Sequence, residues 1–405
     1  MKKNKDVLFM LQFFYPEYNS SATLPYDTAL QLSKSGMSVD VLCGYPREYC
    51  DIEDIPCREI VNNINIHRLK YIQLNRGKKL ARLVNYLSLT VSMFFHIFEM
   101  RKYKTIIVYS NPPILPFVAA LASKLFHCKL VFVAYDLYPE VAIKTDTLSN
   151  DSIITKLMNF INKFVFKQVD AVVALSNEMK DYIVQNRNIS MDKIHVIPNW
   201  YKDEYSDDKY DDNRFESIVK DRLVVSYLGN MGIAQDMECI KEATRYFKND
   251  EDVCFFYCGH GSKFSEIEEM IKNEKIENAY LYGFLKGKDY TDALRISDCA
   301  IISLEKGLTG LCVPSKTYGY MMQGLPIIAI MDDSDIVNDA KEGAGYHVPN
   351  NSTDDLIEVI IKIKNKRLEN QEKGKNSRQI YLNKYTPEIC LDKYVRLLSH
   401  LVDGK

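Results

Sequence analysis

Several signatures of well-known protein classes are missing from this sequence of 405 residues. Its ten cysteines include no Cys-x-x-Cys pair and no Cys/His cluster at zinc-binding spacing. The longest apolar stretch, residues 83–98, is interrupted by polar side chains and is shorter than the roughly 18 to 20 residues that span a bilayer. The first apolar run, residues 7–14, is not followed by a small-residue cleavage site. We therefore expect no zinc site, no membrane span and no signal peptide, and the unpaired thiols favour a reducing cytoplasm.

The composition is that of a folded globular protein. Apolar residues make up 46% of the chain and charged residues 26%, which excludes disordered, collagen-like and coiled-coil proteins. The net charge of −2 conceals an asymmetry, because residues 1–200 carry 24 basic against 18 acidic side chains and the remainder carries 28 against 36. A basic half of this kind is expected near polyanions or an anionic membrane surface.

Strand and helix patterns alternate along the whole chain. Continuous runs of valine and isoleucine, such as those in 105–109 and 129–134, are typical of parallel strands covered on both faces, and the segments between them have helical periodicity. The pattern predicts an α/β protein with two doubly wound sheets. Residues 201–221 are polar and acidic, so we assign them as a linker between domains at 1–200 and 222–385. A C-terminal helix at 386–405 is expected to pack back toward the first domain.

Two loops in the first half follow predicted strands. Residues 14–22 offer backbone N–H groups ahead of a helix, which suits a phosphate or a sugar hydroxyl; alternatively, Ser20 or Ser21 caps a plain loop. No Gly-x-Gly-x-x-Gly motif is present, which disfavours a dinucleotide site. Residues 135–140 read Tyr-Asp-Leu-Tyr-Pro-Glu, and Asp136 either holds a sugar hydroxyl or caps the following turn.

Three loops in the second half have the character of phosphate sites. Glycine turns at 229–232 and 258–262 follow neighbouring strands; each is a weak signal, but two together are harder to dismiss. Residues 307–316 are the most specific stretch, because Ser315 and Lys316 stand at the start of a helix where amides, helix dipole and an ammonium point toward one anion. A diphosphate is the expected ligand. The alternative, a solvated lysine on a surface loop, is disfavoured by the apolar runs on both sides.

The order of these motifs resembles that of the family 4 retaining glycosyltransferases of GT-B fold. The matching features are Tyr-Pro-Glu at 15–17, Asp-Leu-Tyr-Pro-Glu at 136–140, Ile-Pro-Asn at 197–199, Gly-Asn-Met-Gly-Ile-Ala-Gln at 229–235, Gly-His-Gly at 259–261 and Val-Pro-Ser-Lys at 313–316. The resemblance is strongest to the bacterial branch that builds O-antigen, capsule and colanic-acid repeat units, including FucNAc-transferase-like members. It implies two facing Rossmann-like domains, with a nucleotide-sugar donor, expected to be UDP-linked, in the C-terminal one and the acceptor in the N-terminal one.

The motifs and the resemblance together assign roles to individual residues. We place Asp136, Glu140 and Lys316 at the catalytic centre, where the two carboxylates organise the acceptor and the lysine neutralises the leaving diphosphate. The donor-binding residues are expected to be Gly229, Asn230, Gln235, Gly259, His260, Gly261, Gly283, Phe284, Gly310, Leu311, Cys312, Ser315 and Lys316. The acceptor-binding residues are expected to be Tyr18, Asn19, Ser20, Ser21 and Tyr138. No metal or other cofactor is expected, because a lysine and helix dipoles replace a divalent ion.

The sequence departs from the pattern of the broad family in two places. The family usually has a glutamate where Gly319 stands, and a partner glutamate eight residues earlier, where Leu311 stands. Asn230 and Gln235 replace the usual arginine and lysine of the phosphate loop, a change that the related branch shares. The missing glutamates leave a non-catalytic scaffold for an active transferase as an alternative function. A nucleotide-sugar 2-epimerase of the same fold is another alternative.

Residues 65–104 form a basic segment around a predicted helix at 78–101. The basic side chains are Arg68, Lys70, Arg76, Lys78, Lys79, Arg82, Arg101, Lys102 and Lys104, and the apolar ones at helical spacing are Leu80, Leu83, Val84, Leu87, Val91, Phe94, Phe95 and Phe98. Either the helix lies on an anionic leaflet, or the apolar stripe packs it on the protein's own sheet. The two can coexist, with the stripe facing inward and the basic residues meeting lipid headgroups. We expect a cytoplasmic enzyme, peripheral on the inner face of the plasma membrane, with a polyprenyl-diphosphate-linked saccharide as acceptor and no nucleic acid partner.

Overall fold

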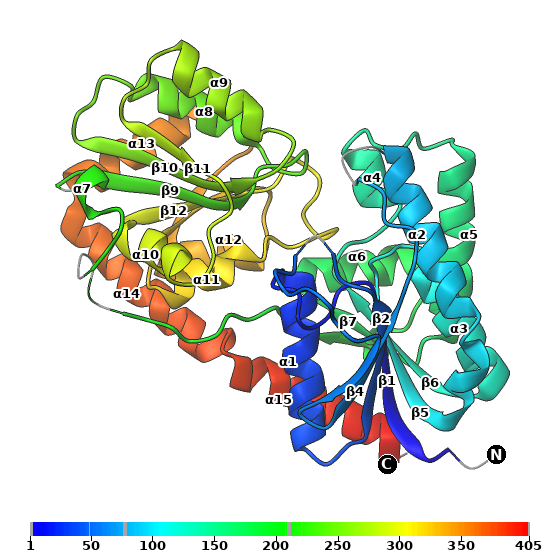
Figure 1. Cartoon of the computed structure of the whole chain (residues 1–405). Helices are drawn as coiled ribbons and strands as arrows, with labels where there is room; N and C mark the ends of the chain where they lie inside the picture. The colour runs from blue at the N-terminus through cyan, green and yellow to red at the C-terminus, as the bar shows by residue number, and fades with distance from the viewer. Residues whose placement is uncertain are drawn as a thin grey trace. The chain divides into compact units, whose positions relative to one another are not determined.

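The computed structural model describes residues 3–47, 49–75, 79–206, 208, 212–219 and 221–403, with only the backbone of Lys79. The chain divides into two units, each built on its own sheet (Figure 1). Unit 1 comprises Met1–Pro198, Gly310–Val313 and Glu388–Lys405, and unit 2 comprises Asn199–Thr309 and Pro314–Pro387. The loop at 310–313 thus belongs to unit 1, although the sequence analysis placed it in the second domain.

The sheet of unit 1 has eight strands in the order β3-β4-β2-β1-β5-β6-β7-β8. The strands are β1 Lys5–Leu11, β2 Val39–Gly44, β3 Arg58–Val61, β4 Ile64–Leu69, β5 Tyr103–Tyr109, β6 Lys129–Ala134, β7 Ala171–Ala174 and β8 Ile194–Val196. All neighbours are parallel except β3 and β4, a hairpin that the sequence analysis did not predict. Its turn residues Asn62 and Asn63 have φ of +50° and +62°, values that asparagine tolerates in a two-residue hairpin turn.

Helices cover the sheet of unit 1, and they bury its central strands on both faces. They are α1 Ser20–Lys34, α2 Lys79–Phe94, α3 Leu115–Phe126, α4 Glu140–Lys144, α5 Ile153–Gln168, α6 Asn177–Arg187 and α15 Pro387–Asp403, with short helices η1 Ile97–Lys102 and η2 Met191–Lys193. Figure 1 shows α2, α3 and α5 running alongside one another. The single helix expected at 78–101 is two helices, since the His96 N–H donates to the Met93 carbonyl oxygen three residues back and tightens the turn.

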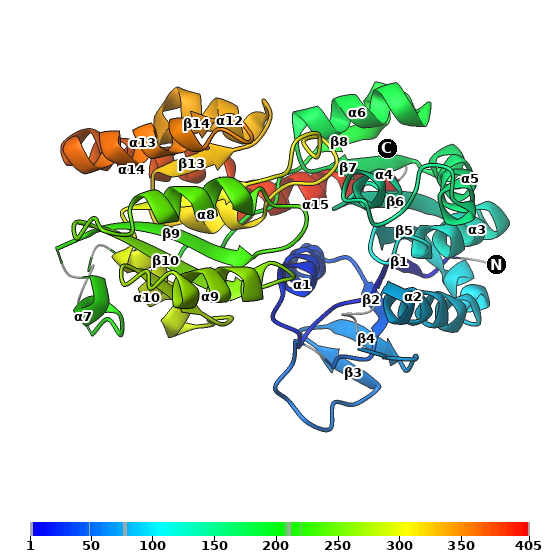
Figure 2. The same cartoon turned by 90° about the horizontal axis from the view of Figure 1, so that it is seen from above.

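The sheet of unit 2 has six parallel strands in the order β11-β10-β9-β12-β13-β14. The strands are β9 Leu223–Asn230, β10 Val253–His260, β11 Ala279–Tyr282, β12 Cys299–Ser303, β13 Ile327–Ile330 and β14 Gly345–Val348. The helices are α7 Glu216–Val219, α8 Met237–Tyr246, α9 Phe264–Asn273, α10 Lys288–Ile296, α11 Lys316–Met322, α12 Asp335–Asp339, η3 Ala340–Ala344, α13 Thr353–Asn365 and α14 Arg367–Lys384. Within this unit α8 and α9 lie on one side of the sheet and α10 and α11 on the other (Figures 1 and 2).

The end of the predicted linker at 201–221 is part of the core of unit 2. Phe215 is 1% exposed, and its ring packs edge-on against Phe256 with centroids 4.9 Å apart. One aromatic side chain therefore anchors a stretch whose polar composition predicted no packing. The residues of this segment at 207, 209–211 and 220 lie outside the described part of the chain.

Candidate active site

Two glycine turns lie side by side in unit 2, at the carboxyl ends of β9 and β10. The parallel register pairs Gly229 with Gly259 and Asn230 with His260. Gly229 and Gly259 have φ angles of +139° and +147°. A Cβ on Gly259 would lie 1.9 Å from the Gly229 carbonyl oxygen. Because only glycine permits this close approach of two backbones, the turns that the sequence treated as separate phosphate loops are one structure.

Further contacts fix the turn that follows β9. The Met231 N–H donates to the His260 carbonyl oxygen at 2.7 Å, and the Gly232 N–H donates to the Gln235 Oε1 atom at 2.8 Å. A Cβ on Gly261 would lie 2.4 Å from the Met231 carbonyl oxygen. Gln235, which was expected to contact the donor, thus uses its side-chain oxygen to shape the turn.

Lys316, the first residue of α11, reaches over this turn. Its Nζ atom lies 3.5 Å from the centroid of the Tyr227 ring and 3.5 Å from the Asn230 carbonyl oxygen. Its Cε atom lies 3.3 Å from where a Cβ on Gly229 would stand, so a side chain at 229 would crowd it. Burial lowers the pKa of Lys316 well below its usual value, and a bound anion would oppose that effect. Ser315 occupies the N-cap position of α11, but its exposed side chain makes no capping hydrogen bond.

An aromatic residue and a histidine flank the glycine turns. The rings of His260 and Phe284 have centroids 5.7 Å apart, and Phe284 is 47% exposed. Burial and the charge of Lys316 lower the pKa of His260, so its imidazole is neutral at pH 7. No atom outside the neighbouring residues lies within 4 Å of a Cβ built on Gly283, so the backbone next to Phe284 borders open space. An exposed ring next to open space can stack on a flat base.

Gly319 lies in α11, where the broad family was expected to have a glutamate. A Cβ on Gly319 would lie 3.4 Å from the Tyr201 ring and 3.5 Å from the Tyr290 hydroxyl oxygen. These two tyrosines, whose ring centroids are 6.5 Å apart, fill the space that a side chain at 319 would enter. A glutamate at this position would have to displace both.

Asp136 follows β6 in unit 1 and is half-buried. The N–H groups of Tyr135 and Asp136 both donate to the Ser110 hydroxyl oxygen at 3.1 Å, which fixes the backbone at this point. Burial raises the pKa of Asp136 to about 6. Asp136 is not the N-cap residue of α4, because Pro139 occupies that position. Whether Asp136 holds a sugar hydroxyl or caps the following turn stays a prediction.

The loop at 310–313 pairs with the segment after β6, inside unit 1. Asp136 and Cys312 form an antiparallel bridge, and the Leu137 N–H donates to the Leu311 carbonyl oxygen at 2.8 Å. Gly310 has a φ of +82° and a Cβ on it would lie 3.1 Å from the Glu178 carbonyl oxygen. These residues were expected beside the donor in the second domain; in the structure they contact the segment at Asp136 and α6.

Glu140 is held by an ion pair within unit 1. Its Oε2 atom lies 2.6 Å from Arg187 at the end of α6, and the two side chains are 18% and 9% exposed. The Arg187 guanidinium also lies 5.7 Å from the Phe166 ring centroid. The Tyr138 carbonyl oxygen accepts a hydrogen bond from the Asn162 amide at 2.6 Å, and burial raises the pKa of the Tyr138 hydroxyl. The Glu140 carboxylate is thus engaged with α6, and its contact with an acceptor stays a prediction.

The loop before α1 has a different cap from either serine that the sequence suggested. Asn19 occupies the N-cap position, and its carbonyl oxygen accepts from the N–H groups of Ala22 and Thr23 at 2.9 and 3.0 Å. Among the residues that the structure describes, no hydrogen-bond partner reaches the buried Nδ2 and Oδ1 atoms of the Asn19 side chain. Ser20 is exposed, and the Tyr18 ring meets Tyr49 edge-on at 6.1 Å. A buried amide of this kind favours a polar ligand.

Two family profiles match the chain. The profile described as Glycosyltransferase Family 4 covers residues 22–205, and the one described as Glycosyl transferases group 1 covers residues 208–380. The chain belongs to the family 4 glycosyltransferases of GT-B fold. This confirms the resemblance that the motifs suggested and shows that the protein is a glycosyltransferase.

Similar proteins agree with the fold of this glycosyltransferase. The probable glycosyltransferase WbjE of Pseudomonas aeruginosa is 26% identical over 300 residues, which cover 72% of this chain and 74% of WbjE. Sucrose-phosphate synthase from Thermosynechococcus elongatus superposes with a TM-score of 0.76 at 14% identity, over 99% of this chain and 100% of the synthase. Anabaena HepE in complex with UDP-glucose gives 0.72 at 14% identity, over 97% and 99% of the two chains. The predicted α/β fold of GT-B type is confirmed.

Sequence reasoning missed several side chains that shape these sites in the glycosyltransferase. Tyr227 lies in β9, two residues before Gly229. Nothing in the neighbouring sequence indicates that Lys316 lies over its ring, so it looks like an ordinary core residue. Tyr290, Ser110 and Arg187 come from elements remote in sequence from the residues that they contact. Only folding brings them together, so a single sequence holds no direct signal for them.

Proposed function

We propose that this glycosyltransferase binds a UDP-linked sugar in unit 2 and transfers the sugar, with retention, to a polyprenyl-diphosphate-linked saccharide in the synthesis of a bacterial surface polysaccharide. The observation that carries the proposal is the position of the Lys316 ammonium against Tyr227, beside the turn at Gly229. A diphosphate there would meet backbone N–H groups and a cation together. HepE, which shares the fold, was solved in complex with UDP-glucose, and this supports the donor class.

The proposed reaction exchanges one bond at the anomeric carbon of the donor sugar. The bond from this carbon to the diphosphate oxygen breaks, and the acceptor hydroxyl oxygen bonds to the same face while its proton passes to the leaving phosphate. Lys316 neutralises the charge that develops on the diphosphate. Asp136 orients the acceptor hydroxyl. No metal ion enters this step, so added Mg²⁺ should leave the rate unchanged.

Nucleotide binding tests the donor assignment directly. Thermal unfolding of the full chain is followed with UDP, GDP, uridine and a panel of UDP-sugars. We expect UDP and one UDP-sugar to stabilise the protein, by about 2.7 kcal/mol at a concentration one hundred times Kd, and uridine to have little effect because it has no diphosphate. Indifference to every nucleoside diphosphate and nucleotide sugar would contradict the proposal.

A non-catalytic scaffold is the second candidate, and the surroundings of Gly319 favour it. Tyr201 and Tyr290 occupy the place where the broad family was expected to have a ribose-binding glutamate. Release of UDP from a UDP-sugar in the presence of a bacterial lipid extract separates the two functions. An active transferase releases UDP, whereas a scaffold neither binds the donor nor turns it over.

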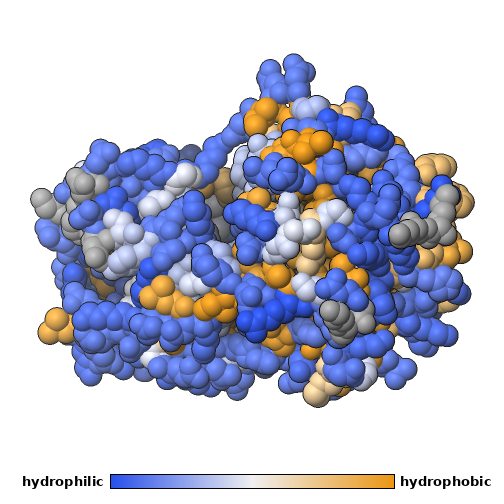
Figure 3. All heavy atoms as spheres, turned by 90° about the horizontal axis from the view of Figure 1, so that it is seen from below, coloured by the Kyte–Doolittle hydropathy of each residue, from blue (hydrophilic) through white to orange (hydrophobic). Residues whose placement is uncertain are grey.

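The proposed site of membrane contact is the outer face of α2 and η1. Six apolar side chains are between 43% and 78% exposed: Leu80, Leu87, Val91, Phe94, Phe95 and Phe98. These six side chains do not pack on the sheet, and the buried residues of α2 are Asn85, Leu89 and Met93. Figure 3 shows such hydrophobic patches among hydrophilic surface on one face of the molecule.

Basic side chains accompany this apolar face. Lys70 and Arg101 are exposed, and Arg82, Lys102 and Lys104 are partly exposed. Of the other predicted basic residues, Arg68 is buried and pairs with Glu59, whereas Arg76 and Lys78 and the side chain of Lys79 lie outside the described part of the chain. None of the helices in the described ranges has the length and apolar sequence needed to cross a bilayer. Apolar side chains beside cations suit an anionic leaflet.

Sedimentation with lipid vesicles tests this contact. We expect the protein to pellet with vesicles of phosphatidylglycerol and phosphatidylcholine, and less at high salt or with phosphatidylcholine alone. The double variant Phe95→Ser, Phe98→Ser should lose binding. Leu368→Ser, at a 78% exposed leucine in unit 2, is the matched control and should bind normally. Equal binding by both variants, or indifference to lipid charge, would rule out the contact.

A further inference from the structure

A cavity of about 430 Å³ opens in unit 1, bordered by β1, β2, β4 and η1, and contains none of the residues assigned to sugar transfer. The ionisable side chains on its wall include Lys5, Asp40, Arg58, His67, His96 and Glu99. Asp40 is engaged, because it lies 3.2 Å from the Lys5 ammonium and accepts a hydrogen bond from the Tyr103 hydroxyl at 2.7 Å. His67, His96 and Glu99 lie close to one another on this wall.

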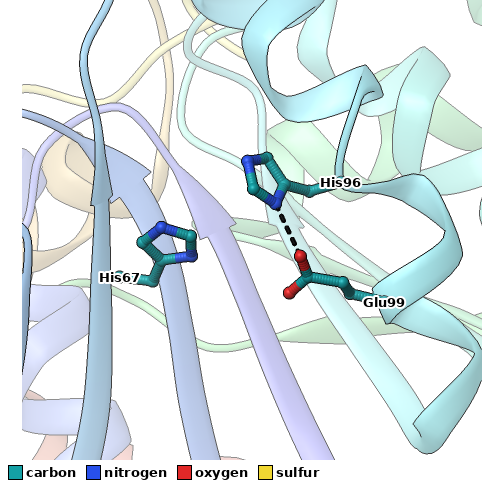
Figure 4. Close-up of side chains that lie close together, drawn as sticks. All are labelled: His67, His96 and Glu99. Carbon is teal, nitrogen blue, oxygen red and sulfur yellow. Dashed lines mark hydrogen bonds and ion pairs between the residues drawn. The ribbon is translucent and has the colours of Figure 1, made fainter.

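These three side chains converge from two sides. His67 projects from β4, whereas His96 and Glu99 come from the turn after α2 and from η1 (Figure 4). One potential ligand atom from each lies within 4.8 Å of the other two. The imidazole rings are 5.1 Å apart and nearly perpendicular, and the His96 Nδ1 atom lies 2.8 Å from the Glu99 Oε1 atom.

We propose that His67, His96 and Glu99 bind a zinc ion, with water from the cavity as the fourth ligand. Two imidazole nitrogens and one carboxylate oxygen are a ligand set that suits Zn²⁺, whereas Mg²⁺ and Ca²⁺ take oxygen ligands. The cavity supplies access for the ion and room for the water. The ion takes no part in the transfer reaction proposed for Lys316 and Asp136.

The site needs only small movements to close on the ion. Ligand atoms about 2.0 to 2.1 Å from a tetrahedral zinc lie about 3.3 Å from one another. The three potential ligand atoms lie within 4.8 Å of one another in the structure, so the most distant pair closes by at most about 1.5 Å. The Glu99 side chain is 53% exposed and the His96 side chain 26%, so Glu99 has room to adjust to the ion. The nearby Arg58 opposes a dication, so we expect the nitrogen preference of zinc, not charge alone, to provide the affinity.

Zinc at this place would tie β4 to the junction of α2 and η1. Phe95 and Phe98, which we propose to contact lipid, stand at this junction and are 78% and 67% exposed. Without the metal, the two imidazole rings of the cluster already meet edge-on across this gap. A metal bridge would therefore stabilise the geometry of the apolar turn.

Zinc titration of the full chain tests the site. The protein is freed of metal with a chelator, and binding of Zn²⁺ is measured by calorimetry and by thermal unfolding, with Mg²⁺ as the comparison. We expect one zinc per chain, a raised Tm and no response to Mg²⁺. His96→Gln and Glu99→Gln should weaken zinc binding at least about 10-fold. Glu99 is exposed, so its variant should fold as the parent does without metal.

Two controls separate this site from the cysteines and from other histidines. His400→Gln, at an exposed histidine of α15, should bind zinc like the parent. X-ray absorption of the zinc-loaded protein should show nitrogen and oxygen neighbours at about 2.0 to 2.1 Å. Sulfur neighbours at about 2.3 Å, or unchanged zinc binding by His96→Gln and Glu99→Gln, would overturn the proposal.

Discussion

The Lys316 ammonium lies 3.5 Å from the centroid of the Tyr227 ring, beside the glycine turn that ends β9. The ring face attracts the cation and holds it in place. This attraction compensates only part of the hydration energy that the ammonium loses on burial. The amine is therefore poised to bind an anion. This pairing explains why a tyrosine with no recognisable motif belongs to the site.

Replacement of Lys316 tests its role in catalysis. Lys316→Ala should lower kcat by roughly 100- to 1000-fold, because the departing diphosphate loses its cation. Lys306→Ala, at an exposed lysine in the loop after β12, should retain the parent rate. Release of UDP from the donor is the measurement, and full activity of Lys316→Ala would refute the assignment.

A pair of glycine variants tests the backbone of the donor site. Gly259→Ala places a Cβ 1.9 Å from the Gly229 carbonyl oxygen at a φ of +147°, whereas a Cβ on Gly283 has no atom within 4 Å. We expect Gly259→Ala to lose the stabilisation by UDP and roughly 1 to 3 kcal/mol of unfolding free energy. Gly283→Ala should change that free energy by less than about 0.5 kcal/mol. Similar behaviour of both variants in urea and UDP titrations would be inconsistent with the close approach of the two turns.

The raised pKa of Asp136 predicts a dependence on pH. Its pKa in the folded protein is about 6, against 3.8 for the free group, so the folded state holds the proton more tightly between these values. Stability relative to Asp136→Asn should therefore fall as pH rises from 4 to 6, by no more than about 3 kcal/mol. Urea unfolding of both proteins at several pH values measures this difference.

Activity should follow the same titration in the opposite sense. The ionised carboxylate is the form that accepts a hydrogen bond from the hydroxyl group of the sugar acceptor. We therefore expect kcat/KM to rise as the pH passes about 6. Asp136→Asn should be slow at every pH and lack this inflection. A parent profile that is flat between pH 5 and 7 would exclude Asp136 from the reaction.

The ion pair of Glu140 and Arg187 predicts a role in stability. The pair is largely buried, so Arg187→Met should lower the free energy of unfolding by about 3 kcal/mol, because it leaves the Glu140 carboxylate without its partner. The control is Lys129→Met, which breaks a more exposed pair with Asp170 and should cost less than about 1 kcal/mol. If Glu140→Gln abolished transfer at unchanged stability, Glu140 would be an acceptor ligand instead.

The sequence by itself determined the fold class and the position of the glycine turns. Periodicity and continuous valine and isoleucine runs are local properties, and they indicated the buried parallel strands of both sheets, such as β5 and β6. Likewise, the glycines at 229, 259 and 261 were visible because left-handed backbone conformations select this residue. The order of motifs was enough to indicate the family.

The tertiary structure alone decided which residues meet. Strand register places Gly259 against Gly229, helix packing sets Lys316 on Tyr227, and the phase of α2 turns Phe94 outward. His67 and His96 follow no metal-binding spacing, yet a strand and a helix end bring them face to face. The physical reason is that contacts between distant segments depend on the register and packing of the elements, whereas the pattern of residues along the chain fixes only what each element is.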